Sequence, residues 1–61
     1  MSLEDKLIRL GVTKESIQLM REEASRLAAA TEQYGIARRY AEQDYLISIY
    51  KAEILKRGGK I

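Results

Sequence analysis

Residues 17–55 read IQLMREEASRLAAATEQYGIARRYAEQDYLISIYKAEIL. One heptad register runs through this stretch without a change of phase, and Arg38 is the single charged side chain at its a and d positions. A repeat of 3.5 residues predicts a helix with one stripe that another helix covers. We call this stripe the heptad seam. It consists of Ile17, Met20, Ala24, Leu27, Thr31, Tyr34, Arg38, Ala41, Tyr45, Ser48, Ala52 and Leu55.

The unbroken seam favours an all-α fold in a single domain, residues 1–61, with a short helix at 3–10 and one long helix at 14–57. Such a helix would extend about 66 Å and would need a second chain, which predicts a coiled-coil-like dimer. The alternative is a three-helix bundle in which a hairpin at Gly35 turns the chain back. Against the hairpin, residues 36–38 offer no capping side chain, and glycine within a helix costs only about 1 kcal/mol.

The start of the chain carries strong local signals for a helical corner. Ser2 is placed to cap the first helix, and Gly11 is placed to end it. Thr13 then caps the next helix, with Val12 and Ile17 at the positions of a hydrophobic staple. We therefore expect residues 10–17 to form a well-defined turn between two helices.

The composition limits both the stability and the chemistry of the chain. Its 61 residues can bury only about 60% of the surface that the unfolded chain exposes, so the core is thin. Cys and His are both absent, which removes disulfides and the usual metal ligands as reinforcement and favours self-association. No phosphate loop or nucleophile motif is present. We expect no catalytic residues, no metal site and no cofactor, and hence no enzyme.

Charge is nearly balanced over most of the chain. Eleven Lys and Arg face nine Asp and Glu, and Lys56, Arg57 and Lys60 account for the excess. Basic residues are usual at the end of a helix because they complement its dipole, so we do not expect nucleic acid as a partner. The sequence also lacks an apolar run long enough to span a membrane and a basic, apolar leader at its start. We therefore expect a cytoplasmic protein.

The second half of the long segment is apolar on two sides. A second stripe lies nearly opposite the heptad seam, at the c and f positions, and a helix with two apolar sides must be covered twice. The stripe is either core or an open docking surface for another protein. Its residues are Ile36, Tyr40, Ile47, Tyr50 and Ile54.

Residues 10–17 also resemble the turn of a helix-turn-helix motif, with Gly11 at the corner and Thr13 at the start of a recognition helix. Leu7 stands where that motif prefers a small residue, and Glu15 would bring negative charge to a DNA groove. An ordinary capped corner explains the same residues. DNA binding through residues 10–17 remains the alternative function.

A wider resemblance covers residues 27–58. In this region the chain resembles small helical proteins encoded by phages and prophages of Gram-positive bacteria. The resemblance implies a phage or mobile-element origin and a role in binding host or phage proteins, and it assigns no site residue. The residues that carry it are Tyr34-Gly35-x-Ala37-Arg38-x-Tyr40-Ala41, Asp44-Tyr45 and Lys51-Ala52-Glu53.

Together these patterns predict a small helical protein–protein interaction module that binds a protein partner through an apolar helical face. Its expected partners are a second copy of itself, as a homodimer, and an unidentified protein. The residues predicted to carry self-association are Ile17, Met20, Leu27, Tyr34, Tyr45 and Leu55. Those predicted to bind the second partner are Tyr40, Ile47, Tyr50 and Ile54.

Overall fold

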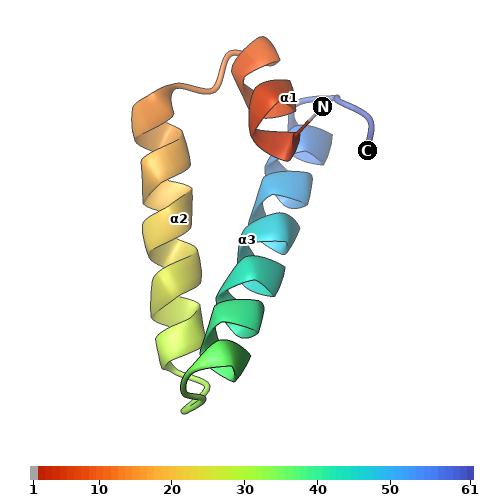
Figure 1. The fold of residues 1–61 in the computed structure, drawn as a ribbon. Coiled ribbons are helices and arrows are strands. Elements are labelled where there is room, and N and C mark those ends of the chain that lie inside the picture. The colour runs from red at the N-terminus through yellow and green to blue at the C-terminus, as the bar shows by residue number, and fades with distance from the viewer. Residues whose placement is uncertain (1) are drawn as a thin grey trace.

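The computed structural model describes residues 2–61 and places in them three helices and no strand. Helix α1 spans Leu3–Arg9, α2 spans Lys14–Ala29 and α3 spans Ile36–Lys56 (Figure 1). The all-α prediction is confirmed.

The corner between α1 and α2 follows the capping signals of the sequence. The Ser2 hydroxyl accepts a hydrogen bond from the Asp5 backbone amide at 3.1 Å, and the Thr13 hydroxyl accepts one from the Ser16 amide at 3.1 Å. Gly11 has a φ of 92°, and the Val12 amide donates to the Leu7 carbonyl at 3.0 Å, which closes α1 with a Schellman motif. Both helix starts and the glycine stop are therefore confirmed.

The long helix predicted over residues 14–57 is not present as one element. Helix α2 ends at Ala29, and α3 begins only at Ile36. In the turn between them, Glu32 has a φ of 60° and Gly35 a φ of 64°, both in the left-handed region. The chain folds back at this turn, and it measures 34 Å along its longest axis instead of the roughly 66 Å of a continuous helix.

The burial of apolar side chains explains why the chain forms a hairpin instead of one continuous helix. Helix α3 starts without a side-chain cap, and a cap contributes about 1 kcal/mol. Folding back lets α2 and α1 cover α3 within one chain, and each large apolar side chain that becomes buried contributes about 1.5–3 kcal/mol. Several such burials outweigh one missing cap. The arrangement agrees with the three-helix alternative.

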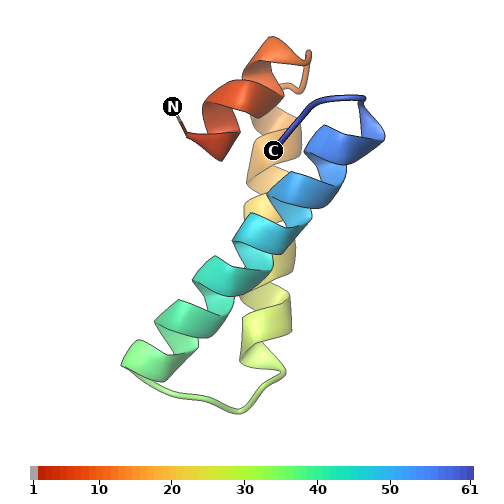
Figure 2. The ribbon, with the colours of Figure 1, turned by 90° about the vertical axis from the view of Figure 1, so that its right-hand side faces the viewer.

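Helices α2 and α3 run antiparallel and cross each other (Figures 1 and 2). The turn between them lies at one end of the molecule, and α1 lies at the other. We call these the hairpin end and the α1 end. On α2, Ala24 and Ala28 are fully buried, and small side chains allow two helices to approach closely.

The core lies at the α1 end, where all three helices meet. Leu7 and Ile54 are its fully buried centre, and Leu3, Leu10, Met20 and Leu46 pack around it. Helix α3 contributes residues of its second stripe to this core, whereas its heptad-seam residues Ser48 and Leu55 are exposed. The buried cluster comprises Leu7, Val12, Ile17, Tyr50 and Ile54.

Candidate functional site

The residues predicted for self-association are dispersed over the fold. Ile17 is buried in the core, and Met20 packs half-buried against it. Leu27, near the end of α2, is about one-third exposed, and Tyr34, in the turn, is 82% exposed. The remaining two are on α3, where Tyr45 is half-buried and Leu55 is exposed. The hairpin thus separates the single stripe into core and surface positions.

The residues predicted for a second partner are divided in the same way. Tyr50 and Ile54 are buried in the core, so in this fold neither presents a surface to another molecule. Ile47 is half-buried. Tyr40 is 69% exposed, and it lies near the hairpin end with the exposed Ile36 one turn before it. The accessible part of the second stripe is therefore the start of α3.

A groove of about 530 Å³ runs along the start of α3 beside the turn. Its α3 residues recur at spacings of three and four, so they form one face of the helix. Two residues of the turn close its other side. We call it the hairpin groove. It is lined by Thr31, Gln33, Ala37, Tyr40, Ala41, Asp44, Tyr45 and Ser48.

The hairpin groove combines small, aromatic and acidic side chains. Ala37 and Ala41 form a shallow stretch on which another helix can approach closely. Tyr40 and Tyr45 supply aromatic rings with hydroxyl groups, which suit an interface that is apolar on one side and wet on the other. The Asp44 carboxylate forms no ion pair with residues 2–61. The groove can therefore accept an apolar helix that brings a cation.

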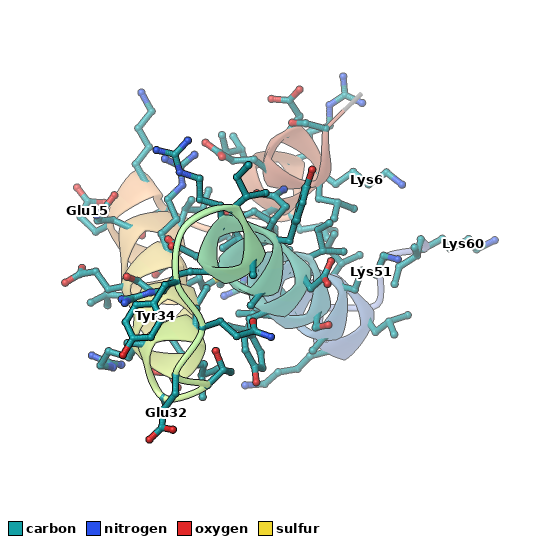
Figure 3. The ribbon with its side chains drawn as sticks, turned by 60° about the horizontal axis from the view of Figure 1, so that its bottom comes forward. Lys6, Glu15, Glu32, Tyr34, Lys51 and Lys60 are labelled. Carbon is teal, nitrogen blue, oxygen red and sulfur yellow. The ribbon has the colours of Figure 1, made fainter. Side chains whose placement is uncertain are left out.

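Tyr34 projects from the molecule beside Glu32 at the hairpin end (Figure 3). It follows Gln33 of the groove directly and precedes Ile36, which is also exposed. Two large apolar side chains thus flank the hairpin groove without being covered by the chain itself. Exposed apolar side chains gathered at one place are typical of an interaction surface.

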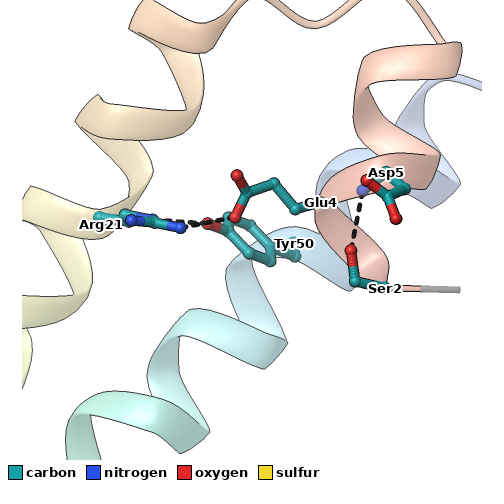
Figure 4. A network of polar contacts seen from close by, with 5 residues as sticks. All are labelled: Ser2, Glu4, Asp5, Arg21 and Tyr50. Carbon is teal, nitrogen blue, oxygen red and sulfur yellow. Dashed lines mark hydrogen bonds and ion pairs between the residues drawn. The ribbon is translucent and has the colours of Figure 1, made fainter.

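A polar network of Arg21, Glu4 and Tyr50 joins the three helices at the α1 end (Figure 4). Arg21 on α2 forms an ion pair with Glu4 on α1 at 2.6 Å, and its Nε donates to the Tyr50 hydroxyl on α3 at 3.4 Å. The hydrogen bonds to Tyr50 and Glu4 raise the pKa of Arg21 above its usual value. The network gives the buried ring of Tyr50 a partner for its hydroxyl and orients α1 across the hairpin.

Several residues of the corner at 10–17 pack in the core or cap a helix. Val12 and Ile17 are buried, and the Thr13 hydroxyl serves as the cap of α2. The exposed side of α2 carries Glu15 and Glu22, which would meet DNA phosphates with like charge. DNA binding through this corner remains a prediction.

Two features are absent from residues 2–61. None of their helices has the length and apolar character that crossing a membrane requires. The described side chains also contain no cluster of three or more acidic, His or Cys residues suited to holding a metal ion.

The residues that come together only through the turn could not be predicted from the sequence. The place of Asp44 in the hairpin groove is one example, because Thr31 and Gln33 of the turn complete that groove. The Arg21 network was missed for the same reason, since Glu4 and Tyr50 lie 17 and 29 residues from Arg21. The available signal in the sequence was the grouping of Tyr40 and Tyr45 with Ala37 and Ala41 at helical spacings of three and four.

Comparison of the chain with protein-family models, with curated proteins and with solved structures gave no match.

Proposed function

We propose that the chain is a small protein-interaction module that binds an amphipathic helix of a partner protein in the hairpin groove. The observation that carries the proposal is the exposure of Tyr34, Ile36 and Tyr40 around a groove of small side chains. These side chains lie outside the buried cluster of large apolar residues, which is at the opposite end.

The aromatic side chains supply the main binding energy in this proposal. Tyrosine buries a large area, loses little conformational entropy and is frequent among interface residues that dominate affinity. Tyr40 is 69% exposed in the isolated chain, so a partner would remove most of its surface from water. Tyr45, already half-buried, would form the floor of the same contact.

Asp44 defines the chemistry of the partner. Its carboxylate lines the groove together with two tyrosine rings, so a Lys or Arg side chain would be attracted by the charge of Asp44 and by cation–π contact with a ring. Small residues at 37 and 41 favour close approach by another helix. The expected partner segment is therefore an amphipathic helix with an apolar stripe and one basic residue opposite Asp44.

The proposal also includes self-association, but through surface residues of the folded-back chain and not through the whole heptad seam. A two-stranded coiled coil through the whole heptad seam needs a continuous helix, and the chain turns back at residues 30–35. The exposed seam residues Leu27, Tyr34 and Leu55 stay available for contacts between copies. A phage or mobile-element origin, as the resemblance over residues 27–58 implies, fits a small chain that acts by binding other proteins.

Selection from a displayed library of helical peptides tests the proposed groove. Peptides that bind the wild-type chain should share an apolar stripe with one Lys or Arg. They should lose about tenfold or more in affinity for a Tyr40→Ala variant, as expected when an interface aromatic residue is truncated. Asp44→Asn should weaken the same peptides and remove the preference for a basic residue.

Ile8→Ala provides the matched control, because Ile8 is an exposed apolar residue on α1, outside the hairpin groove. Its peptide affinities should equal those of the wild-type chain. Failure to select any binder, or selection of peptides that bind Tyr40→Ala as tightly as the wild type, would overturn the proposal.

A further inference from the structure

The end of the chain folds back onto α1 because of two glycines. After α3, the Gly58 amide donates to the Leu55 carbonyl at 3.0 Å and the Gly59 amide to the Ile54 carbonyl at 2.8 Å, which is a Schellman motif. A Cβ atom on Gly59 would lie 2.8 Å from both Leu10 Cδ1 and Ile54 Cγ2. Only glycine fits there without displacing the core.

This return brings three cations into one groove. Lys60 follows Gly59 directly, and the Lys6 Nζ donates to the Lys60 carbonyl oxygen at 3.4 Å. Arg9 lies one turn further along α1, and Leu10 forms the apolar floor between them. This groove has a volume of about 300 Å³, and we call it the basic groove. It is lined by Lys6, Arg9, Leu10, Gly59 and Lys60.

The charges of the basic groove are not neutralised within residues 2–61. The described ion pairs join Arg21 to Glu4, Arg26 to Glu23 and Arg57 to Glu53, and none includes a groove residue. Like charges held together repel one another, and the repulsion is relieved when an anionic group binds. The groove therefore suits a partner that carries carboxylates around an apolar side chain.

The same chain presents such a surface on the exposed side of α2. Glu15, Leu19 and Glu22 recur at spacings of four and three, so they share one helix face. Leu19 is 65% exposed, and neither glutamate forms an ion pair among the described residues. We call these three residues the acidic face. Arg26 continues the same face but is paired with Glu23.

The two surfaces lie on opposite sides of the molecule. Figure 3 shows Glu15 on one side and Lys6 and Lys60 on the other. A single chain cannot bring them together, and a second copy can. Their patterns match, because each has an apolar residue between charged residues, and the signs are opposite.

We infer that the basic groove binds the acidic face of a second copy of the chain. Glu15 and Glu22 pair with the cations of the groove, and Leu19 covers Leu10. The contact is head-to-tail, so each added copy still presents one free surface of each kind. This inference deepens the self-association part of the proposed function and rests on it, but it uses surfaces away from the hairpin groove, so either can fail alone.

Paired charge reversals test the inference. The first variant carries Lys6→Glu and Lys60→Glu, and the second carries Glu15→Lys and Glu22→Lys. Sedimentation equilibrium at low salt should show self-association of the wild-type chain. Each variant alone should have an apparent Kd raised by about tenfold or more, because like charges then face one another.

Mixing the two variants should restore association. The unchanged acidic face of the first meets the unchanged basic groove of the second, and the two reversed surfaces also match. Added salt should weaken both the wild-type complex and the restored one. A control variant with Arg38→Glu and Arg39→Glu changes the net charge by the same amount as the first variant, but at the hairpin end. It should associate like the wild type.

Circular dichroism should first establish that every variant is as helical as the wild type. A wild-type chain that stays monomeric at low salt would overturn the inference. So would folded variants that fail to associate when mixed. Association that persists in both variants would also contradict it, and would assign self-association to another surface. A peptide that binds the hairpin groove should bind the Lys6→Glu/Lys60→Glu and Glu15→Lys/Glu22→Lys variants as tightly as it binds the wild type, whichever result is obtained.

Discussion

The two ends of this molecule use their apolar residues differently. At the α1 end, Leu7 and Ile54 are completely buried, and even Tyr50 has its hydroxyl bonded to Arg21. At the hairpin end, Tyr34 and Tyr40 are exposed beside a groove of small side chains. The large apolar side chains at the α1 end thus stabilise the fold, whereas those at the hairpin end remain available for contacts. Substitutions at the two ends should therefore separate stability from binding.

The largest effect is expected at the centre of the core. Ile54→Ala removes a fully buried side chain and leaves a cavity, which costs about 2–5 kcal/mol in the free energy of unfolding. For a chain this small, that is a large part of the total stability. Urea denaturation followed by circular dichroism measures it. Leu55→Ala, one residue further along and exposed, should change the free energy by less than about 0.5 kcal/mol. Equal losses in both variants would contradict the location of the core.

The next largest effect is expected in the turn. Gly35 has a φ of 64° and a ψ of −134°, and no atom lies within 4 Å of a Cβ built on it. Gly35→Ala would therefore cause backbone strain without a clash, and should cost about 1–3 kcal/mol. Glu32→Gly should not destabilise the chain in the same urea titration, because the φ of 60° at residue 32 suits glycine. A neutral effect of Gly35→Ala would argue that residue 35 is helical in solution.

A smaller effect is expected at the capped corner. Thr13→Ala removes the acceptor for the Ser16 amide and should cost about 1 kcal/mol in thermal or urea unfolding. Thr13→Ser keeps the hydroxyl and should recover most of that loss. If serine were as destabilising as alanine, the stabilisation would come from the threonine methyl group and not from the cap.

The smallest effect on stability is expected at the hairpin groove. Tyr40→Ala changes a side chain that the fold leaves exposed, so its urea midpoint should differ from that of the wild type by less than about 0.5 kcal/mol. Its peptide affinity should fall nonetheless, as proposed above. A stability loss as large as that of Ile54→Ala would place Tyr40 in the core and would remove the distinction between the two ends.

The α1 end was largely predictable from sequence, because its signals are local. Ser2, Gly11 and Thr13 act on residues within a few positions of themselves, through hydrogen bonds that the helix ends require. Val12 and Ile17 follow from the same corner. These choices do not depend on where the rest of the chain lies.

The turn was not predictable in the same way. The heptad pattern continues through Gly35, and glycine within a helix costs only about 1 kcal/mol, so local energies hardly separate a hairpin from a rod. The deciding contribution is non-local. Tyr50 and Ile54 become buried against Leu7 and Ile17 only after the chain has folded back. The hairpin groove and the basic groove could not be predicted for the same reason, since each is assembled from segments that are distant in sequence.

Small-angle X-ray scattering at low protein concentration and high salt tests most directly that the chain folds back on itself, because high salt suppresses the head-to-tail contact. We predict the mass of one chain, a radius of gyration close to the 12.1 Å of the Cα trace and a longest dimension far below that of one continuous helix. The mass of two chains with a dimension near the roughly 66 Å of a continuous helix would contradict this prediction.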